Sequence, residues 1–222
     1  MNALTQDETL LIGSSKDIEN LAQKEEATVL VISDSHGAKE KLKSILNERG
    51  AYSDALVFCG DGIGDLLSII VQATYDDAVM QTIPPVIAIV QGNNDSGFYM
   101  LRTQEERIKA PLTQTMTICA HKFFITHGHR FCLYDGTMPL VTAAQQEEAE
   151  AVLYGHTHVA IGEKSHGMLT LNPGSCARPR DRQLPCYAIL NVKKTSSNFV
   201  FMFYELSGLK SHLYAPEFSG LW

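Results

Sequence analysis

The sequence lacks the cysteine pattern of a disulfide-stabilised protein or of a zinc finger. The number of cysteines is odd, and no Cys-x-x-Cys pair occurs among them. They are Cys59, Cys119, Cys132, Cys176 and Cys186. Because disulfides persist in oxidising compartments, this pattern favours a reducing one, and we expect a cytoplasmic protein without a disulfide framework.

A long apolar run is also missing. No uncharged apolar stretch approaches the roughly 20 residues that span a bilayer. The opening residues MNALTQDETLLIG have neither a basic segment nor a long apolar core, so they do not resemble a signal peptide. We therefore expect no association with a membrane.

Positive charge is scarce. Lys and Arg total 18 against 25 for Asp and Glu, which gives a formal net charge of -7. A protein that coats nucleic acid needs the opposite balance, so no stable nucleic-acid binding is expected. This charge does not exclude a small phosphate-bearing substrate held at a local cationic site.

What the sequence has is a large apolar fraction. Hydrophobic residues make up 45% of its 222 residues, which is enough for a core that needs no metal to stabilise it. Any bound metal is therefore expected to serve chemistry. Residues 1–26 are interpreted as an N-terminal extension with a short helix in 14–26, and residues 27–222 as a single domain.

The first half of that domain alternates between strands and helices. Apolar, β-branched runs predict buried strands at 27–33, 55–60 and 84–92. Periodic stretches predict helices at 38–50 and 65–79. This alternation indicates an α/β layer with parallel strands.

The second half is rich in strands. A hairpin is predicted at 112–119 and 121–127, and a helix at 139–151. Further strands are expected at 152–155, 159–163, 168–172, 186–192 and 199–206. A strand-rich half joined to an α/β half suggests two sheets packed face to face, with helices outside.

Polar side chains that can bind metals directly follow five of the predicted strands. They occur in the blocks SDSHG, CGDG, GNND, THGH and GHTH. Taken alone, the first three blocks are explained as turns or helix caps, and THGH as ordinary histidines at a strand end. A single GHTH supports only a suspicion of metal binding. Five independent turns have no shared reason to supply Asp, His and Asn, and the carboxyl ends of parallel strands line one crevice. We therefore expect the five blocks to converge on one site.

The candidate ligands carry imidazole, carboxylate and amide groups but no thiolate. They are Asp34, His36, Asp61, Asn93, His127, His156 and His158. This set suits Mn, Fe, Ni or Zn. One catalytic zinc needs about three protein ligands, so seven are enough for two ions that share a ligand. The glycines beside them permit tight turns and close backbone approach: Gly60, Gly92, Gly128 and Gly155.

The five blocks, in this order, resemble the calcineurin-like metallophosphoesterases, and LNPGSCARPR at 171–180 resembles their small prokaryotic phosphodiesterase branch. The resemblance covers about residues 28–192. It implies a four-layer αββα sandwich and two divalent metal ions, with Mn as the first choice and Ni, Fe or Zn as alternatives. It assigns one ion to Asp34, His36 and His158, the other to Asn93, His127 and His156, and makes Asp61 the bridge between them.

The resemblance further implies hydrolysis of small phosphodiesters, in which a metal-bridging hydroxide attacks phosphorus in line with the leaving oxygen. Many members carry His where this chain has Asn94, and an amide cannot donate a proton as an acid. We expect Asp95 to orient its neighbours. The leaving group would take its proton from His129, from His36 through water, or from solvent, so good leaving groups should be favoured.

Other interpretations stay open. Arg178, Arg180 or Arg130 could hold a substrate phosphate, or could be solvated side chains of surface loops. One retromer subunit resembles this fold but acts as a scaffold with altered metal-site residues, so a non-enzymatic scaffold is one alternative. A phosphomonoesterase or nucleotide hydrolase is another. The branch implies a homodimer or homotetramer, to which the aromatic residues of 209–222 could contribute.

Overall fold

The structure is a computed structural model that describes residues 2–101, 107–133 and 136–217. Its helices are α1 Ser15–Gln23, α2 Lys39–Arg49, α3 Ile63–Ala73, α4 Asp77–Met80 and α5 Met138–Gln146, with a short 3-10 helix at Gly50–Tyr52. Its first strands are β1 Glu26–Ile32, β2 Ala55–Phe58, β3 Val86–Ile89, β4 Phe98–Met100, β5 Arg107–Lys109, β6 Thr113–Ile118 and β7 His121–Thr126. The others are β8 Ala151–Leu153, β9 Ala160–Ser165, β10 Met168–Pro173, β11 Cys186–Lys193, β12 Ser196–Ser207 and β13 Lys210–Tyr214.

Two large sheets form the centre of the molecule. The first has the strand order β13-β12-β11-β1-β2-β3, and the second has the order β6-β7-β8-β10-β9. β1, β2 and β3 run parallel to one another, as the sequence predicts, and β6 pairs with β7 as the expected hairpin. In the second sheet β7, β8 and β10 are also parallel.

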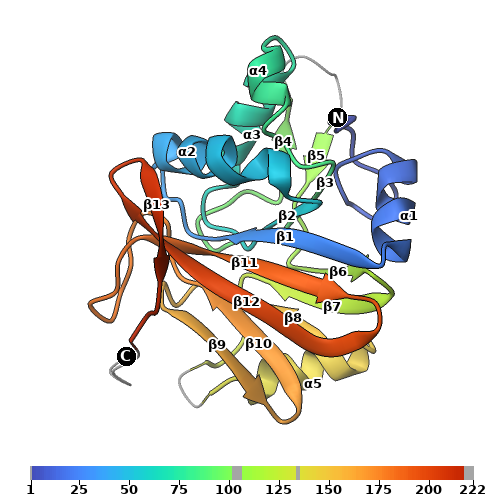
Figure 1. The fold of residues 1–222 in the computed structure, drawn as a ribbon, viewed down its shortest axis with the longest axis vertical. Helices are drawn as coiled ribbons and strands as arrows, with labels where there is room; N and C mark the ends of the chain where they lie inside the picture. The colour runs from blue at the N-terminus through green and yellow to red at the C-terminus, as the bar shows by residue number, and fades with distance from the viewer. Residues whose placement is uncertain (1, 102–106, 134–135, 218–222) are drawn as a thin grey trace.

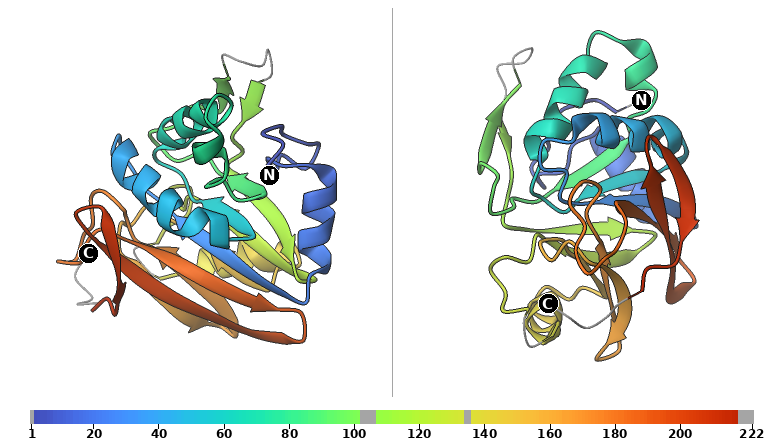
Figure 2. Two further views of the ribbon diagram at one scale, coloured as in Figure 1. Left: turned by 45° about the horizontal axis from the view of Figure 1, so that its top comes forward. Right: turned by 90° about the vertical axis from the view of Figure 1, so that its left-hand side faces the viewer.

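Helices cover the outer face of each sheet (Figures 1 and 2). The first sheet carries α2 and α3, and the second carries α5. The arrangement is the expected four-layer αββα sandwich. None of the described helices is long and apolar enough to cross a membrane.

Side chains of the central strands alternate between two cores. Leu30 and Ile32 of β1 pack in the cluster that includes α2 and α3, whereas Val29 and Val31 pack between the sheets. Residues 29–32 are apolar at every position because both faces of this part of the strand are buried. Such a strand is rigid, which suits it to fix the residues that follow it.

The helix predicted at 65–79 is wrong in its extent. The structure divides it into α3 and α4, with Thr74 to Asp76 between them. Asp76 is the N-cap of α4, since its side chain accepts hydrogen bonds from the backbone N–H groups of Ala78 and Val79. A carboxylate cap competes with continuation of the preceding helix, and this competition ends α3 at Ala73.

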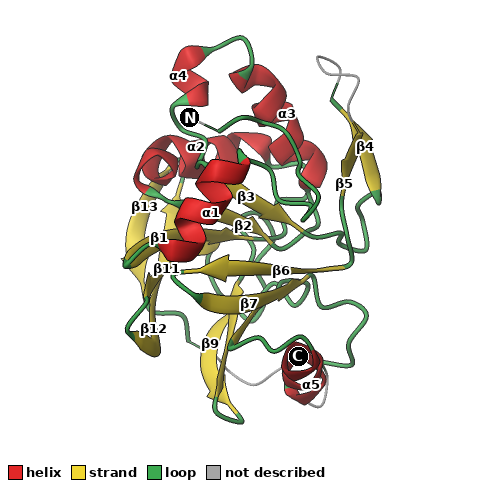
Figure 3. Ribbon diagram, turned by 90° about the vertical axis from the view of Figure 1, so that its right-hand side faces the viewer, coloured by secondary structure: helices red, strands yellow, loops and turns green. Residues whose placement is uncertain are grey.

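Three strands have no counterpart in the sequence predictions. β13 extends the first sheet, and β4 and β5 pair as a separate antiparallel ribbon that stands beside α3 (Figure 3). Tyr214 of β13 packs against the core between the sheets, and Phe218 and Trp222 lie outside the described residues.

Residues 2–25 lie against the sandwich. Ile12 exchanges backbone hydrogen bonds with Ile87 of β3, at 2.8 Å each, and so extends the edge of the first sheet. Leu21 of α1 is buried in the core between the sheets. The predicted helix in this segment is confirmed as α1.

Candidate metal centre

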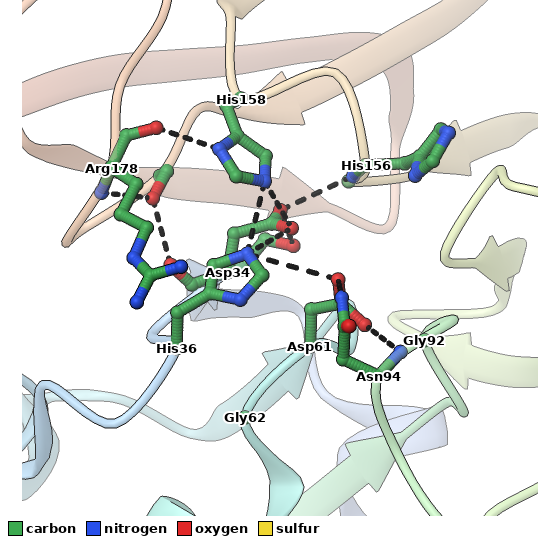
Figure 4. Close-up of polar contacts among 12 residues, drawn as sticks. Asp34, His36, Asp61, Gly62, Gly92, Asn94, His156, His158 and Arg178 are labelled. Carbon is green, nitrogen blue, oxygen red and sulfur yellow. Dashed lines mark hydrogen bonds and ion pairs between the residues drawn. The ribbon is translucent and has the colours of Figure 1, made fainter.

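The predicted ligands all lie in loops that follow strands at one end of the two sheets. Asp34 and His36 follow β1, Asp61 follows β2 and Asn93 follows β3. On the second sheet, His127 follows β7, and His156 and His158 follow β8. The sandwich packs these ends together, so residues separated by more than 120 positions meet (Figure 4).

Asp34, His36 and His158 form a compact set, called the Asp34 group below. His158 Nε2 lies 3.1 Å from Asp34 Oδ1 and 3.0 Å from His36 Nε2. His36 Nε2 lies 3.6 Å from Asp34 Oδ1. Three potential ligand atoms thus face one small volume, as a metal site requires.

Asn93, His127 and His156 form the His127 group. His127 Nε2 lies 3.2 Å from Asn93 Oδ1. The ring of His156 packs against that of His127, with their centroids 5.1 Å apart. Asn93 is exposed and His156 is half-buried, so this group lies closer to solvent than the Asp34 group.

Asp61 lies between the two groups. Its Oδ2 atom is 3.7 Å from His36 Nε2 and 3.6 Å from His127 Nε2. One carboxylate therefore approaches imidazoles of both groups. This position is the one expected of a ligand shared by two ions.

Strand geometry does not set the directions of the His156 and His158 side chains. Strand alternation would place side chains at i and i+2 on one side. β8 ends at Leu153, however, and both histidines lie beyond it with positive φ angles of 70° and 61°. The ring of His158 turns towards Asp34 and that of His156 turns away from it (Figure 4).

Left-handed backbone is concentrated at the candidate ligands. Besides those two histidines, Asp34, His36 and Asp61 have φ angles of 57°, 43° and 55°. A non-glycine residue in this region is strained by about 1–3 kcal/mol. Strain at five of seven candidate ligands indicates that the fold holds these side chains in place for function.

Two imidazoles are fixed by hydrogen bonds at Nδ1. His158 Nδ1 donates to the carbonyl oxygen of Arg178 at 2.6 Å, and His127 Nδ1 donates to that of Cys59 at 2.7 Å. A neutral ring that donates from Nδ1 keeps a lone pair on Nε2. In both residues Nε2 is the atom that faces the candidate site, which suits a metal ligand.

Asn94 and Asp95 support Asp61. The backbone N–H and side-chain amide of Asn94 donate to the two Asp61 carboxylate oxygens, at 2.8 and 2.6 Å. Asp95 accepts hydrogen bonds from the backbone N–H groups of Asp61 and Gly92 on Oδ2, and of Gly62 and Ile63 on Oδ1. Asp95 therefore acts through the loop that carries Asp61.

His129 lies beside the His127 group. Its ring centroid is 5.4 Å from that of His127 and 6.2 Å from that of His156. Its Nδ1 atom is buried without a hydrogen-bond partner among the described residues. Burial, with the neighbouring charges of His127 and Arg130, lowers the pKa of His129.

The pKa values of histidines in the two groups shift in opposite directions. Burial opposes ionisation of Asp34, but the neighbouring imidazoles of His158 and His36 outweigh it and hold the pKa of the carboxyl well below its usual range. Burial also opposes the charged form of His158, yet the neighbouring carboxylate of Asp34 raises the pKa of His158. In the other group, burial and then His127 lower the pKa of His156.

Two of the glycines allow the loops to approach one another. A Cβ atom on Gly92 would collide with the backbone N and side chain of Asp61, and one on Gly155 would collide with the side chains of Ser33 and Asp34. No side chain fits at either position without displacing a candidate ligand. The expected role of these two glycines agrees with the geometry.

The residues present fit a cation. Asp34 Oδ1 is buried and has no hydrogen-bond partner among the described residues, although a buried carboxylate oxygen normally has one. It lies 3.1 Å from His158 Nε2 and 3.6 Å from His36 Nε2. A divalent ion here would satisfy both the oxygen and the nitrogens.

A cleft of about 510 Å³ opens onto the site. Its lining includes His36, Asp61, Asn94, Tyr99 and Arg178. Neither Arg180 nor Arg130 belongs to the lining. The structure therefore separates Arg178 from the other two candidate phosphate-binding arginines.

Sequence reasoning missed several supporting residues. Asp65 accepts hydrogen bonds from Ser35 Oγ at 2.6 Å and from the Gly37 N–H at 2.8 Å, which fixes the loop after β1. Asn172 donates to the carbonyl oxygen of Gly155 at 2.8 Å. Asn172 lies in the LNPGSCARPR stretch, which carried a family signal but no indication of this contact.

Comparisons with known proteins cover most of the chain. The sequence model described as the calcineurin-like phosphoesterase superfamily domain matches residues 28–195. YsnB of Bacillus subtilis, named a probable metallophosphoesterase, is 29% identical over 184 residues, which are 81% of this chain and 92% of YsnB. Phosphodiesterase MJ0936 of Methanocaldococcus jannaschii is 28% identical over 169 residues, or 74% of this chain and 92% of its own.

Solved structures share the architecture. A predicted phosphoesterase from Streptococcus pneumoniae superposes with a TM-score of 0.60 at 26% identity, over 85% of this chain and 98% of that one. Vacuolar Protein Sorting 29 from Cryptosporidium parvum gives a TM-score of 0.64 at 19% identity, over 88% and 100% of the two chains. At that identity the second likeness concerns the fold alone.

Proposed function

Because the chain belongs to the calcineurin-like phosphoesterase superfamily, we propose that it is a metal-dependent hydrolase of small phosphodiesters. Relatives that match most of its length are named metallophosphoesterase and phosphodiesterase, and these names support the reaction class. The acidic net charge of -7 agrees with a small substrate rather than a long nucleic acid.

The observation that carries the proposal is the position of Asp61. Its Oδ2 atom lies 3.7 Å from His36 Nε2 and 3.6 Å from His127 Nε2, between two groups of candidate ligands. A protein with a single metal has no need of a carboxylate in this place. We infer a site for two ions, with Asp61 as the shared ligand.

Each group would then hold one ion. The Asp34 group supplies a carboxylate and two imidazoles, and the His127 group supplies an amide oxygen and two imidazoles. Nitrogen and oxygen donors without sulfur suit Mn, Fe, Ni or Zn. Mn stays the first choice because the family resemblance implies it, with Ni, Fe or Zn as alternatives. When bound, the two ions would activate a water for in-line attack on phosphorus and neutralise the phosphate oxygens that gain charge.

The chain's own residues would set the geometry of this reaction. Asn94 holds both oxygens of Asp61, and Asp95 fixes the loop on which Asp61 stands. The carbonyl oxygens of Arg178 and Cys59 orient the rings of His158 and His127. Positions fixed in this way before substrate binds lower the cost of reorganisation in the transition state.

The leaving group receives little help from the chain. The side-chain amide of Asn94 donates a hydrogen bond to Asp61 and cannot act as an acid in any case. His129 and a water on His36 stay proposals for the proton donor. We therefore expect an activated aryl phosphodiester to be cleaved much faster than an alkyl one, and equal rates would contradict this part of the proposal.

A scaffold is the second candidate, because a Vacuolar Protein Sorting 29 structure shares this fold with a TM-score of 0.64. All seven candidate ligand positions carry metal-binding side chains in this chain, which favours hydrolysis. A phosphomonoesterase or nucleotide hydrolase would use the same ligands and is separated from a diesterase only by substrate. A cytoplasmic location and a homodimer or homotetramer also stay proposals.

The deciding experiment is a hydrolysis panel. Chelated protein is reloaded separately with Mn, Ni, Zn or Mg and assayed on an aryl phosphodiester, an aryl phosphomonoester and a cyclic nucleotide. We expect activity to vanish on chelation, to return with Mn, and to be highest on the aryl diester. Undiminished activity after chelation, or none with any metal, would contradict the proposal.

A further inference from the structure

Arg178 is the one side chain with a permanent positive charge among the described residues that line the cleft. Three carboxylates share that lining: Asp61, Asp65 and Asp95. An isolated guanidinium in an acidic cleft is normally expected to pair with one of them. Arg178 makes no ion pair within the described part of the chain.

The three carboxylates are already engaged. Asp61 accepts from Asn94, and Asp95 accepts from four backbone N–H groups. Asp65 accepts from Ser35 Oγ and from the N–H of Gly37. The guanidinium thus stays available to a ligand in the cleft.

The backbone of Arg178 is fixed on two sides. Its carbonyl oxygen accepts from His158 Nδ1 at 2.6 Å, and its N–H donates to Ser175 Oγ at 2.7 Å. Ser175 Oγ in turn donates to the carbonyl oxygen of Asp34 at 2.7 Å. The base of the side chain is therefore tied to two candidate ligands, and its guanidinium extends towards the His36 side of the site (Figure 4).

We propose that Arg178 binds a non-bridging oxygen of the substrate phosphate at the metal centre. This inference rests on the proposed function and names a further residue that contacts the substrate. A guanidinium offers paired N–H donors that match two phosphate oxygens, and it keeps its charge at every working pH. Its charge also offsets part of the negative potential that the three carboxylates create for an incoming phosphate.

Arg180 provides a matched control two residues away. Its side chain is exposed, as is that of Arg178, but it lies outside the cleft lining, and its backbone N–H donates to the carbonyl oxygen of His158 at 3.0 Å. Substitution of either arginine leaves these backbone contacts in place. The two variants lose the same charge, so they differ only in where that charge stood.

The test compares Arg178→Gln, Arg178→Lys and Arg180→Gln as full-length, Mn-loaded proteins. Two readouts are measured: kcat/KM on an aryl phosphodiester, and the Kd of inorganic phosphate by calorimetry. Arg178→Gln should lower kcat/KM by about tenfold to a hundredfold, as expected for a lost charge-assisted contact, and should weaken phosphate binding about tenfold. Arg178→Lys should recover part of both, and Arg180→Gln should change either by less than about twofold.

Measuring Mn affinity shows whether Arg178→Gln loses activity through weaker substrate binding or through damage to the metal centre. Arg178→Gln should bind Mn at least as tightly as the unaltered protein, because it removes a positive charge near the site. Equal effects of the two glutamine variants, or weakened Mn binding in Arg178→Gln alone, would overturn the proposal. An inactive unaltered protein would refute the proposed function instead, while phosphate binding would still decide the role of Arg178.

Discussion

In the Asp34 group, ring and carboxylate atoms of three residues lie 3.0, 3.1 and 3.6 Å apart, and Asp34 and His158 are buried. In the His127 group, only Asn93 and His127 approach within 3.2 Å, and His156 touches His127 by ring packing. Both groups contain two imidazoles and one oxygen ligand. They differ in the charge of that oxygen ligand and in their exposure to solvent.

This difference predicts two ions of unequal affinity. The buried carboxylate of Asp34 contributes a full negative charge at a place where water screens it little. The amide of Asn93 contributes only a dipole, and it does so at an exposed position. The Asp34 group should hold its ion tightly and the His127 group loosely. The loosely held ion is the easier one to exchange for another metal.

Asp61→Ala should have the largest effect, because it removes the carboxylate that we propose the two groups share. We expect kcat/KM to fall by roughly a thousandfold or more, as several kcal/mol of transition-state stabilisation depend on both ions. Metal content, measured by mass spectrometry, should fall for both sites. Asp76→Ala is the control, since it removes a helix cap, costs about 1 kcal/mol of stability and leaves the site intact.

His158→Ala and His156→Ala test whether the Asp34 group binds its ion more tightly than the His127 group. In a Mn titration, His158→Ala should abolish the tight binding step, because it removes the nitrogen 3.1 Å from Asp34 Oδ1. His156→Ala should abolish only the weak step. In each variant, Mn affinity at the affected site should fall by more than the roughly 10- to 100-fold that follows removal of a side chain that only orients a ligand. Identical titration curves for the two variants would mean that the groups do not differ as inferred.

Asp95→Asn should have the next largest effect. The substitution keeps the shape of the side chain but replaces one acceptor oxygen with an N–H₂ group that faces backbone donors. Unfolding free energy should fall by about 2 kcal/mol, or roughly 4–8 °C in Tm, and Mn affinity by about 10- to 100-fold. A loss of stability with unchanged Mn affinity would show that the loop does not transmit the contact to Asp61.

The sequence was sufficient to predict the layers and to bring the candidate ligands to neighbouring strand ends. Strand ends of a parallel sheet converge by topology, so Asp34, Asp61 and Asn93 could be brought together from pattern alone. The contact of His158 with His36 spans 122 positions, and no local periodicity encodes it. This contact was expected only because the family resemblance assigns both histidines to the same ion.

What the sequence could not supply are contacts that depend on loop conformation. The left-handed backbone at His156 and His158, which aims the two rings apart, follows from tertiary packing rather than from strand geometry. The break between α3 and α4 had a visible signal in Asp76, but helical periodicity outweighed it. β4 lies in a short apolar run at 98–101, but its partner β5 has the sequence RIK, so no pair of apolar runs marked the ribbon.

That ribbon supplies the smallest predicted effect, through Tyr99. Its hydroxyl accepts from the Ser96 N–H at 2.9 Å and donates to Asp95 Oδ1 at 3.3 Å, so Tyr99→Phe removes an indirect tie to Asp61. One neutral hydrogen bond is worth about 1 kcal/mol, which predicts a fall in kcat/KM of about fivefold.

The effect of Tyr99→Phe should not vary with pH. Burial and then the charge of Asp95 raise the pKa of Tyr99 to about 12, so the phenol stays protonated and keeps donating throughout a profile from about pH 6 to 9. Tyr75→Phe is the matched control, because Tyr75 is 77% exposed, and it should leave kcat/KM unchanged. A ratio between Tyr99→Phe and the unaltered protein that changes across the profile would show that Tyr99 takes part in proton transfer, and the ribbon would then belong to the reacting site rather than to its support.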